Sequence, residues 1–481
     1  MAGIVGIADS GQEKWVEAAL RKIEHRGGAG ETIRPLDGAT LGQVWPTAQE
    51  RFAVDADQRA TVLDGETYNW THLSAEASSA LEALETGYRE RGPDFVAEVD
   101  GPFAMAIAGE RGVFLARDTL GKSPLYFGES AGKLYFASEL KALLDNGCDM
   151  SEFPPGHYYE PGRGLVRYSR IEKQPTLDMS NEEAATELRS RLVASVKKRL
   201  KGGEVGCWLS GGIDSATMTA LATRQRRKVE TFVVGVEGAP DLEYAEMVAR
   251  FVESRHHERI CTLDDMLEAL PEVIYHLESF DALLVRSSIT NFMVGKLASE
   301  HVPAVLSGEG GDELFAGYQY LKEIAPSDLP DELVDITRRL HNTALQRVDR
   351  CSSSHGLVAK TGFLDRDVVD FALQIPPSMK LYDNEIEKWI LRQAMDGLLP
   401  DEVVNRTKSK FWEGAGVGEL LAAHSEEAVS DAEFAAERKL PTGEVLNTKE
   451  ELFYHRVFHE QFGEAVDPSL VGRTKGAPVE K

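Results

Sequence analysis

The first third of the chain alternates short apolar runs with glycine- and proline-containing breaks, a pattern typical of strands joined by tight turns. We predict strands from the apolar runs at residues 3–8, 60–63, 103–108, 113–116 and 133–136. Helix-like spacing of apolar residues interleaves with them at residues 14–23, 74–91 and 138–145. This pattern predicts a layered α+β domain that is rich in antiparallel strands.

From about residue 204 the apolar runs alternate regularly with helical patterns. Strand-like runs at 204–209 and 229–236 are each followed by a helix-like segment, and a further strand is predicted at 303–306. This alternation predicts an α/β fold with a doubly wound parallel sheet. After residue 323 the pattern is mostly helical.

A polar stretch at residues 170–178 separates these two patterns. It precedes an amphipathic segment, 179–201, whose start carries the helix-initiating residues Ser180 and Glu183. We therefore predict a first domain over residues 1–170 and a second over 179–465. Residues 466–481, which contain Pro, Gly and Lys, are predicted to form a flexible tail.

Composition narrows the class of protein. The chain has 481 residues and a net charge of −26, which argues against a nucleic-acid partner. Its four cysteines are scattered without a CxxC pair, which disfavours a zinc knuckle or a disulfide framework and fits a reducing cytoplasm. Apolar runs are too short to span a bilayer, and the first residues do not resemble a secretory signal. We expect a cytoplasmic protein without a membrane partner; the sequence leaves the oligomeric state open, and a homodimer is one option.

A glycine-rich segment, Ser210-Gly-Gly-Ile-Asp-Ser215, follows a predicted strand and opens a predicted helix. Glycines there let backbone N–H groups approach phosphate oxygens, and the helix N-terminus favours negative charge. Asp214 would repel a phosphate, so its place is explained by a bridging Mg²⁺. The dinucleotide fingerprint and the Walker A pattern are both absent from this segment.

A second glycine-rich segment, Ser307-Gly-Glu-Gly-Gly-Asp-Glu313, also follows a predicted strand. Asp312 could give a metal its second carboxylate, and Glu309 could act as a base or hold an ammonium group. Because parallel strands place their carboxyl ends at one edge of a sheet, the two segments predict one active-site crevice.

Together these segments resemble the asparagine synthetase family. Ser210–Ser215 resembles the pyrophosphate-loop signature of ATP pyrophosphatases, and further agreement with the synthetase domain lies at residues 274–281, 305–318, 345–350, 355–357, 363–365, 388–392 and 406–411. Residues 115–126, 136–142 and 153–157 resemble the class II glutamine amidotransferase domain of the same family. The resemblance implies an N-terminal Ntn-hydrolase-like sandwich, then a pyrophosphate-loop synthetase domain with a helical C-terminal part.

The resemblance also implies a reaction. ATP and Mg²⁺ are the expected cofactors, and a small-molecule carboxylate such as aspartate would attack the α-phosphorus to give an acyl-adenylate and pyrophosphate. Asp214 and Asp312 would hold metal, Lys408 would stabilise the transition state, and Glu309 could accept a proton from the attacking amine. The residues expected to bind ATP are Leu209, Ser210, Gly211, Gly212, Asp214, Ser215, Val234, Ser307 and Gly308.

The amidotransferase part departs from its family at the residues that act on glutamine. The family's nucleophilic cysteine is replaced by Ala2, whose methyl group cannot attack an amide. An asparagine that helps stabilise the oxyanion is replaced by Asp64, whose carboxylate would oppose that charge. We therefore predict an inactive glutaminase and an amine that is free ammonia or belongs to another substrate.

The acceptor carboxylate is less well specified. Val358, Lys360 and Gly362 stand where asparagine synthetases usually have Glu, Arg and Pro. Lys360 and Arg286 are candidate ligands of an anionic substrate. Aspartate with ammonia is the leading hypothesis, and a β-lactam-synthetase-like ligase that uses an amine of its own substrate is the alternative. A non-catalytic relic would be expected to have lost Asp214 and Lys408 first.

Two other readings are disfavoured. A tRNA-thiolating enzyme of this class would need catalytic cysteines and a basic face, and neither is evident. The pair His256-His257 suggests zinc, but neighbouring strand residues point to opposite faces, which favours a local structural role.

Overall fold

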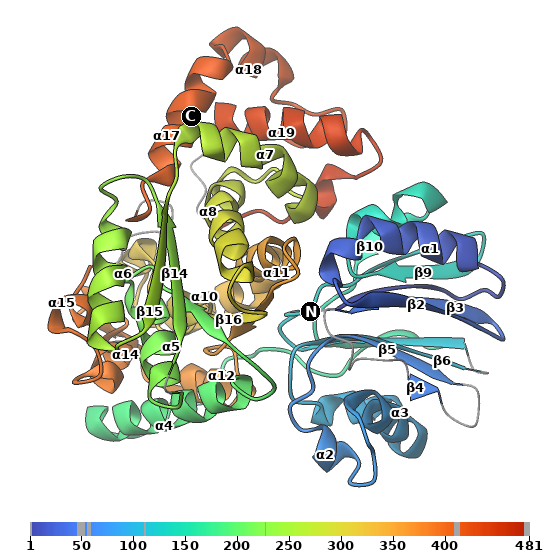
Figure 1. Cartoon of the computed structure of the whole chain (residues 1–481), viewed down its shortest axis with the longest axis horizontal. Coiled ribbons are helices and arrows are strands. Elements are labelled where there is room, and N and C mark those ends of the chain that lie inside the picture. Colours follow the sequence, from blue (N-terminus) through green and yellow to red (C-terminus); the bar gives the residue numbers. More distant parts are fainter. Residues whose placement is uncertain are drawn as a thin grey trace. The chain divides into compact units, whose positions relative to one another are not determined.

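The computed structural model describes residues 2–45, 53–54, 59–109, 112–226, 228–407 and 414–475. The chain forms two compact units (Figure 1). The first consists of Met1–Ile171, Ser353–Gly356 and Glu464–Leu470, and the second of Glu172–Ser352, Leu357–Gly463 and Val471–Lys481. Within the described residues, every helix is too short or too polar to cross a membrane.

The first unit is built on two antiparallel sheets packed face to face. Over the described ranges each has six strands, in the orders β10-β8-β9-β1-β3-β2 and β12-β11-β7-β6-β5-β4. Apolar side chains of both sheets, such as Leu41, Leu115 and Phe136, share one buried core. The strands are β1 (Gly3–Ile7), β2 (Gly30–Leu36), β3 (Ala39–Trp45), β4 (Ala53–Val54), β5 (Ala60–Gly65), β6 (Phe103–Gly109), β7 (Gly112–Arg117), β8 (Tyr126–Ser130), β9 (Lys133–Ala137), β10 (Asp149–Glu152), β11 (His157–Glu160) and β12 (Gly164–Arg167).

Helices cover the outer faces of this sandwich. α1 (Glu13–Lys22) packs on β1, β2 and β3, and α3 (Ala80–Arg91) packs on β5 beside the short α2 (Trp70–Leu73) (Figure 1). Short 3₁₀ helices lie at η1 (Glu24–Arg26), η2 (Pro93–Glu98) and η3 (Leu140–Asn146). The predicted layered α+β architecture with antiparallel strands is confirmed. The helix predicted over 74–91 is shorter, because Ser79 caps its N-terminus by accepting a hydrogen bond from the Glu82 N–H.

The second unit contains the predicted parallel sheet. Its strand order is β15-β14-β13-β16-β17, and every neighbouring pair is parallel. The strands are β13 (Gly206–Trp208), β14 (Glu230–Gly235), β15 (Arg255–Ile260), β16 (Ala304–Ser307) and β17 (Val358–Thr361), with a separate hairpin of β18 (Leu381–Tyr382) and β19 (Ile386–Glu387). The chain winds outward in opposite directions from β13 and β16, so a crevice forms beyond the carboxyl ends of these two strands.

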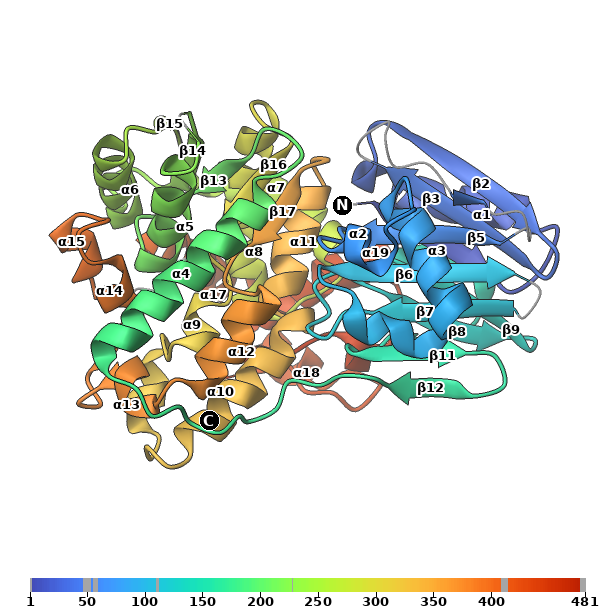
Figure 2. The same cartoon turned by 90° about the horizontal axis from the view of Figure 1, so that it is seen from below.

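The helices of this unit surround the sheet. α4 packs against α5, α12 and α14 (Figure 2). It begins at the predicted helix start, where Ser180 and Glu183 form a capping box. The α-helices are α4 (Asn181–Arg199), α5 (Ile213–Thr223), α6 (Pro240–Phe251), α7 (Leu263–Leu277), α8 (Ala282–Ser299), α9 (Gly311–Leu314), α10 (Leu329–Arg338), α11 (Ala344–Ser353), α12 (Arg366–Gln374), α13 (Pro377–Lys380), α14 (Trp389–Met395), α15 (Asp401–Val404), α17 (Val417–Ala428), α18 (Asp431–Glu437) and α19 (Lys449–Phe462). Further 3₁₀ helices are η4 (Gln319–Glu323), η5 (Arg339–Asn342) and η6 (Pro468–Leu470).

Part of the segment predicted to be a flexible tail is held in place. The Thr474 hydroxyl donates a hydrogen bond to Asp281 (2.7 Å), and the Lys475 ammonium pairs with Glu332 (2.7 Å) and Asp335 (2.8 Å). These contacts anchor the segment to α8 and α10. Residues 476–481 lie outside the described part of the chain.

Candidate active site

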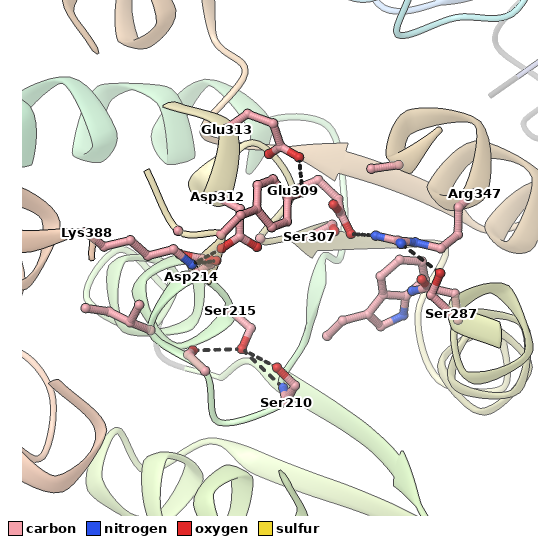
Figure 3. A pocket seen from close by; sticks show the side chains of 18 of the residues that line it. Ser210, Asp214, Ser215, Ser287, Ser307, Glu309, Asp312, Glu313, Arg347 and Lys388 are labelled. Atoms are coloured by element: carbon pink, nitrogen blue, oxygen red, sulfur yellow. Dashed lines mark hydrogen bonds and ion pairs between the residues drawn. The ribbon is translucent and has the colours of Figure 1, made fainter. Parts of the chain in front are cut away.

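A cavity of about 840 Å³ lies beyond the carboxyl ends of β13 and β16 (Figure 3). The loop after β13 and the loop after β16 both line it, as expected for strands at which the winding direction reverses. The lining includes these sequence-predicted residues: Leu209, Ser210, Gly212, Asp214, Ser215, Val234, Ser307, Gly308, Glu309 and Asp312. The two glycine-rich segments therefore meet in one site.

The loop Ser210–Ser215 is shaped by its own hydrogen bonds. The Ser210 N–H donates to the Ser215 hydroxyl (3.2 Å), which in turn donates to the Gly212 carbonyl (3.1 Å). Gly211 has φ +69°, and a Cβ there would stand 2.3 Å from the Cβ of Tyr244. The loop thus needs glycine to turn tightly into α5, whose N-terminus then faces the cavity.

Arg406 holds this loop from outside. Its guanidinium donates to the Ser210 carbonyl (3.2 Å), pairs with Asp241 (2.6 Å) and lies 4.1 Å from the centre of the Tyr244 ring. Arg406 also lines the cavity, so one cation both fixes the loop and adds positive charge beside it.

A lysine joins the two loops. The Lys388 ammonium lies 2.5 Å from Asp214 and 2.6 Å from Asp312, and only 1% of its side chain is exposed (Figure 3). Asp214 is in the first turn of α5, Asp312 is in the first turn of α9, and Lys388 directly precedes α14. A Cβ at Gly317 would stand 2.0 Å from Asp312 and 2.3 Å from Lys388, so this packing requires glycine. Three elements far apart in sequence therefore converge on one charge cluster.

The donor set of this cluster fits a magnesium–nucleotide complex. Asp214 and Asp312 converge on Lys388, and both line the cavity. Mg²⁺ bound with a nucleotide usually takes one or two carboxylates and completes its shell with phosphates and water. The described residues contain no group of three or more His, Cys, Asp or Glu side chains that could hold a metal by themselves. The chemistry of the site therefore matches a metal that arrives with phosphate.

Glu309 has a cationic partner that sequence reasoning did not assign. Arg347 of α11 donates to the Glu309 carboxylate (2.5 Å) and to the Ser287 hydroxyl of α8 (3.0 Å) (Figure 3). Burial opposes the charge on Arg347, but the neighbouring Glu309 carboxylate raises the pKa of the guanidinium. Arg347 thereby holds the Glu309 carboxylate in place at the cavity wall.

Glu313, a second carboxylate on the same segment, is buried. The Tyr318 hydroxyl donates to Glu313 at 2.5 Å, and both side chains line the cavity. Burial raises the pKa of Glu313 to about 7, helped by the negative charges of Asp312 and Glu309. The raised pKa of Glu313 makes this carboxyl group a better proton carrier near neutral pH than an exposed glutamate.

Three of the predicted residues that the structure describes are outside the cavity lining, namely Gly211, Arg286 and Lys360. Arg286 pairs through its guanidinium with the Glu450 carboxylate (2.6 Å), and it is not among the described residues that line the cavity. Lys360 is buried in β17 and is likewise outside that lining. Arg286 is therefore engaged in joining α8 to α19, and Lys360 is sequestered by the sheet. Lys408 lies outside the described residues.

The histidine pair is explained by local contacts. His257 Nε2 lies 2.6 Å from the Glu230 carboxylate, and His256 Nδ1 lies 3.0 Å from the Thr231 hydroxyl. Both contacts link β15 to β14, and the described residues hold no three-ligand cluster there. The observed contacts agree with the local structural role expected for this pair.

In the first unit, charged side chains are buried beside Ala2. The Arg26 guanidinium donates to the Ala2 carbonyl (2.9 Å), to Asp64 (3.0 Å) and to Glu139 (2.8 Å), and Arg26, Asp64 and Glu139 are completely buried. The Ser138 hydroxyl also donates to Asp64 (3.0 Å). The carboxylate that departs from the family pattern is thus neutralised by an internal ion pair.

Comparison with known proteins gives the family. The family described as asparagine synthase matches residues 187–333 and 326–475, and the one described as glutamine amidotransferase domain matches residues 1–154. The chain is 35% identical to a probable glutamine-hydrolysing asparagine synthetase of Schizosaccharomyces pombe, with 85% of this chain and 82% of the relative covered. It is 33% identical to asparagine synthetase B of Escherichia coli (92% and 87% covered) and 32% identical to asparagine synthetase 2 of Arabidopsis thaliana (95% and 86% covered). The chain belongs to the asparagine synthetase family of carbon–nitrogen ligases.

Proposed function

We propose that this enzyme uses ATP to convert the side-chain carboxylate of aspartate into an amide, forms AMP and pyrophosphate, and takes free ammonia rather than glutamine as its nitrogen source. The observation that carries the proposal is the cluster of Asp214, Asp312 and Lys388 beside the Ser210 loop, in a cavity at the reversal point of the sheet. A site that combines phosphate-binding amides, carboxylates and a buried cation suits the transfer of an adenylyl group.

Activation of the carboxylate is the first step. The loop Ser210–Ser215 would hold the β- and γ-phosphates, and an oxygen of the acceptor carboxylate would attack the α-phosphorus as the bond to pyrophosphate breaks. Mg²⁺ held by Asp214 and Asp312 would supply charge neutralisation for the departing pyrophosphate. Lys388 is positioned to stabilise the same negative charge, and we assign this role also to Lys408.

Attack by ammonia is the second step. The nitrogen lone pair would add to the acyl carbon, and AMP would leave with the electrons of the acyl–oxygen bond. Glu309 is held by Arg347 at the cavity wall and could accept the proton released by nitrogen. Arg347 and Ser287 would then position both Glu309 and an anionic acceptor, in place of Arg286 and Lys360.

The use of free ammonia is inferred from the first unit. Ala2 has no nucleophilic atom, and Asp64 is paired with Arg26 at 3.0 Å inside the unit. A carboxylate in this place opposes the negative charge that develops on an amide oxygen during hydrolysis. The amidotransferase unit would accordingly act as a structural part of the enzyme.

Release of pyrophosphate from Mg-ATP tests the proposal. We expect release that needs both aspartate and ammonium, with no release when glutamine replaces ammonium. Asp214→Asn should lower the rate about 100-fold or more, since charge stabilisation in the transition state is lost. The matched control Asp264→Asn changes an exposed aspartate of α7 and should keep the wild-type rate.

Two results would contradict the proposal. Glutamine-driven release would show that the amidotransferase unit is active. Release that needs no ammonium would indicate a substrate that carries its own amine, as in the β-lactam-synthetase-like alternative. Asparagine itself should be identified among the products by mass spectrometry.

A further inference from the structure

The last described residues of the chain form part of the cavity wall. Thr474 and Lys475 both line the cavity. Just before them, Gly472 packs so closely on η5 that a Cβ there would stand 2.1 Å from the Asn342 carbonyl oxygen. We call residues 471–475 the strap. The two reaction steps described above leave the strap without a role, although it lies at the site where they would occur.

The strap joins two helices that line the cavity. The hydroxyl and the backbone N–H of Thr474 donate to the Asp281 carboxylate (2.7 and 3.2 Å). Asp281 is the N-cap of α8, where it also accepts from the Leu284 N–H (2.9 Å). Lys475 pairs with Glu332 of α10 (2.7 Å). Because side chains of both α8 and α10 line the cavity, the strap bridges two of its walls.

The strap borders the part of the cavity that holds Glu309. Ala344 lies two positions after Asn342, which the strap contacts, and it lines the cavity at the start of α11. Arg347 is one turn further along α11 and holds the Glu309 carboxylate. This is where ammonia would meet the acyl carbon.

The anchors of the strap differ in strength. Asp281, the partner of Thr474, is 2% exposed. The side chains of Lys475 and its second partner Asp335 are 38% and 39% exposed, and exposed ion pairs contribute little to stability. A segment that is held by few contacts opens locally without unfolding its neighbours. The strap can therefore open and close while α8 and α10 stay folded.

We propose that the strap closes this part of the cavity during the reaction and keeps water away from the acyl-adenylate. Where water enters, its oxygen adds to the acyl carbon, AMP leaves with the electrons of the acyl–oxygen bond, and a proton passes to solvent. ATP is then consumed without formation of an amide. Opening of the strap lets the acceptor enter and the amide leave. Thr474 and Lys475 are thus positioning residues, and this inference rests on the proposed function.

Two variants remove the strap's anchors. A chain that ends at Arg473 lacks Thr474 and Lys475, and the double variant Thr474→Val with Lys475→Met keeps the chain length but loses the polar contacts. One control is a chain that ends at Lys475, which keeps the strap. The other is Lys173→Met, which breaks a second exposed lysine pair with α10, at Asp331 (2.9 Å), outside the described cavity lining. Thermal unfolding establishes that each variant is folded.

The ratio of pyrophosphate released to amide formed tests the exclusion of water. The enzyme is assayed with Mg-ATP, aspartate and ammonium. Wild type and both controls should release about one pyrophosphate per amide, whereas the two strap variants should release at least about three, because water then competes with ammonia. A lost structural contact alone would lower both products together. A ratio of about one in both strap variants would overturn the proposal.

Access to the cavity is measured separately, without turnover. Ala344→Cys places a thiol on the cavity wall beside the strap, and its labelling by N-ethylmaleimide is followed by peptide mass spectrometry. The four native cysteines are buried. We expect labelling to be about 10-fold faster in the chain that ends at Arg473, since a closed strap would be open less than about a tenth of the time.

The two measurements separate the possible failures. Equal labelling with and without the strap would show that the strap does not cover the cavity, whatever the activity of the enzyme. If wild type releases no pyrophosphate, the proposed function fails and the water-excluding role fails with it. A 10-fold difference in labelling would in that case still support the strap as a cover of the cavity.

Discussion

At the residue scale, Lys388 and Arg347 each hold carboxylates that belong to other elements. Lys388 pairs with Asp214 and Asp312, while Arg347 joins Glu309 to Ser287. A lysine is a compact point charge that suits two converging carboxylates, whereas an arginine offers a planar fork that can donate in two directions. The two cations are therefore not interchangeable.

Arg347→Lys tests this difference. A lysine keeps the charge but cannot reach Glu309 and Ser287 with the same fork, so Glu309 loses its fixed orientation. We expect kcat for pyrophosphate release to fall about 10- to 100-fold, roughly 1.4–2.7 kcal/mol, with an unchanged melting temperature. The matched control is Arg250→Lys, which alters an exposed pair with Glu246. A wild-type kcat in Arg347→Lys would contradict the positioning role.

At the scale of elements, the sequence was sufficient wherever local chemistry decides the structure. The pattern predicted α4 and its start near Ser180, and it predicted the strand–loop–helix arrangement around Ser210. The two glycine-rich segments were predicted to meet because parallel strands end at a common edge. These are short-range signals that the periodicity carries by itself.

Long-range pairings were not predictable in the same way. Lys388 and Arg347 lie in segments that resemble the family, but their partners are distant in sequence and set by tertiary packing. Arg286 was expected to bind substrate, and it pairs instead with Glu450, which lies 164 positions away. The sequence of an apolar helix does not show whether a charged side chain on it binds substrate or pairs with another helix. That choice depends on which helix packs against it.

The short helix α13 contains a buried cation with a consequence for pH. Lys380 is 3% exposed, and burial lowers its pKa to about 7. The unfolded chain keeps this lysine protonated up to about pH 10.5, so unfolding binds a proton between the two values and stability rises with pH there. Below about pH 7 the lysine is protonated in both states and the full cost of its burial remains.

Lys380→Met should remove this dependence. We expect the variant to have a larger free energy of unfolding than wild type at pH 7. This difference in free energy should shrink by up to about 1.4 kcal/mol per pH unit towards pH 10. Urea unfolding at pH 7, 8 and 9 measures it. A difference that is independent of pH would show that Lys380 is not neutral in the folded state.

At the scale of the whole molecule, the two units place their charged side chains differently. The second unit holds carboxylates and cations around a cavity, whereas the first encloses Arg26, Asp64 and Glu139 in a completely buried network. Buried ion pairs of this kind are strongly destabilising to break, because removal of one partner leaves an uncompensated charge. Replacement of Arg26, Asp64 or Glu139 alone would therefore destabilise the first unit.

The variant Ala2→Cys tests whether a nucleophile at position 2 is sufficient for the use of glutamine. We expect that the variant does not use glutamine, because Asp64 still opposes an oxyanion and Arg26 stays paired with it. Glutaminase assays should show no more glutamate release than wild type, with ammonia-dependent synthesis unchanged. Mass spectrometry should first establish that Met1 has been removed, so that the cysteine carries a free amine. Glutamine-dependent synthesis by this single variant would show that the nucleophile alone was missing.

The buried position of Lys388 also bears on ionic strength. The chain carries 79 acidic side chains, and the interactions of exposed charges are screened over about 8 Å at physiological salt. The ammonium of Lys388, at 1% exposure, is largely shielded from that screening, and so are its contacts with Asp214 and Asp312. Added salt would therefore reorganise the counter-ion atmosphere around the acidic surface and leave this charge cluster as it is. A fall of activity in concentrated salt would then report slower capture of charged substrates, while the catalytic groups keep their arrangement.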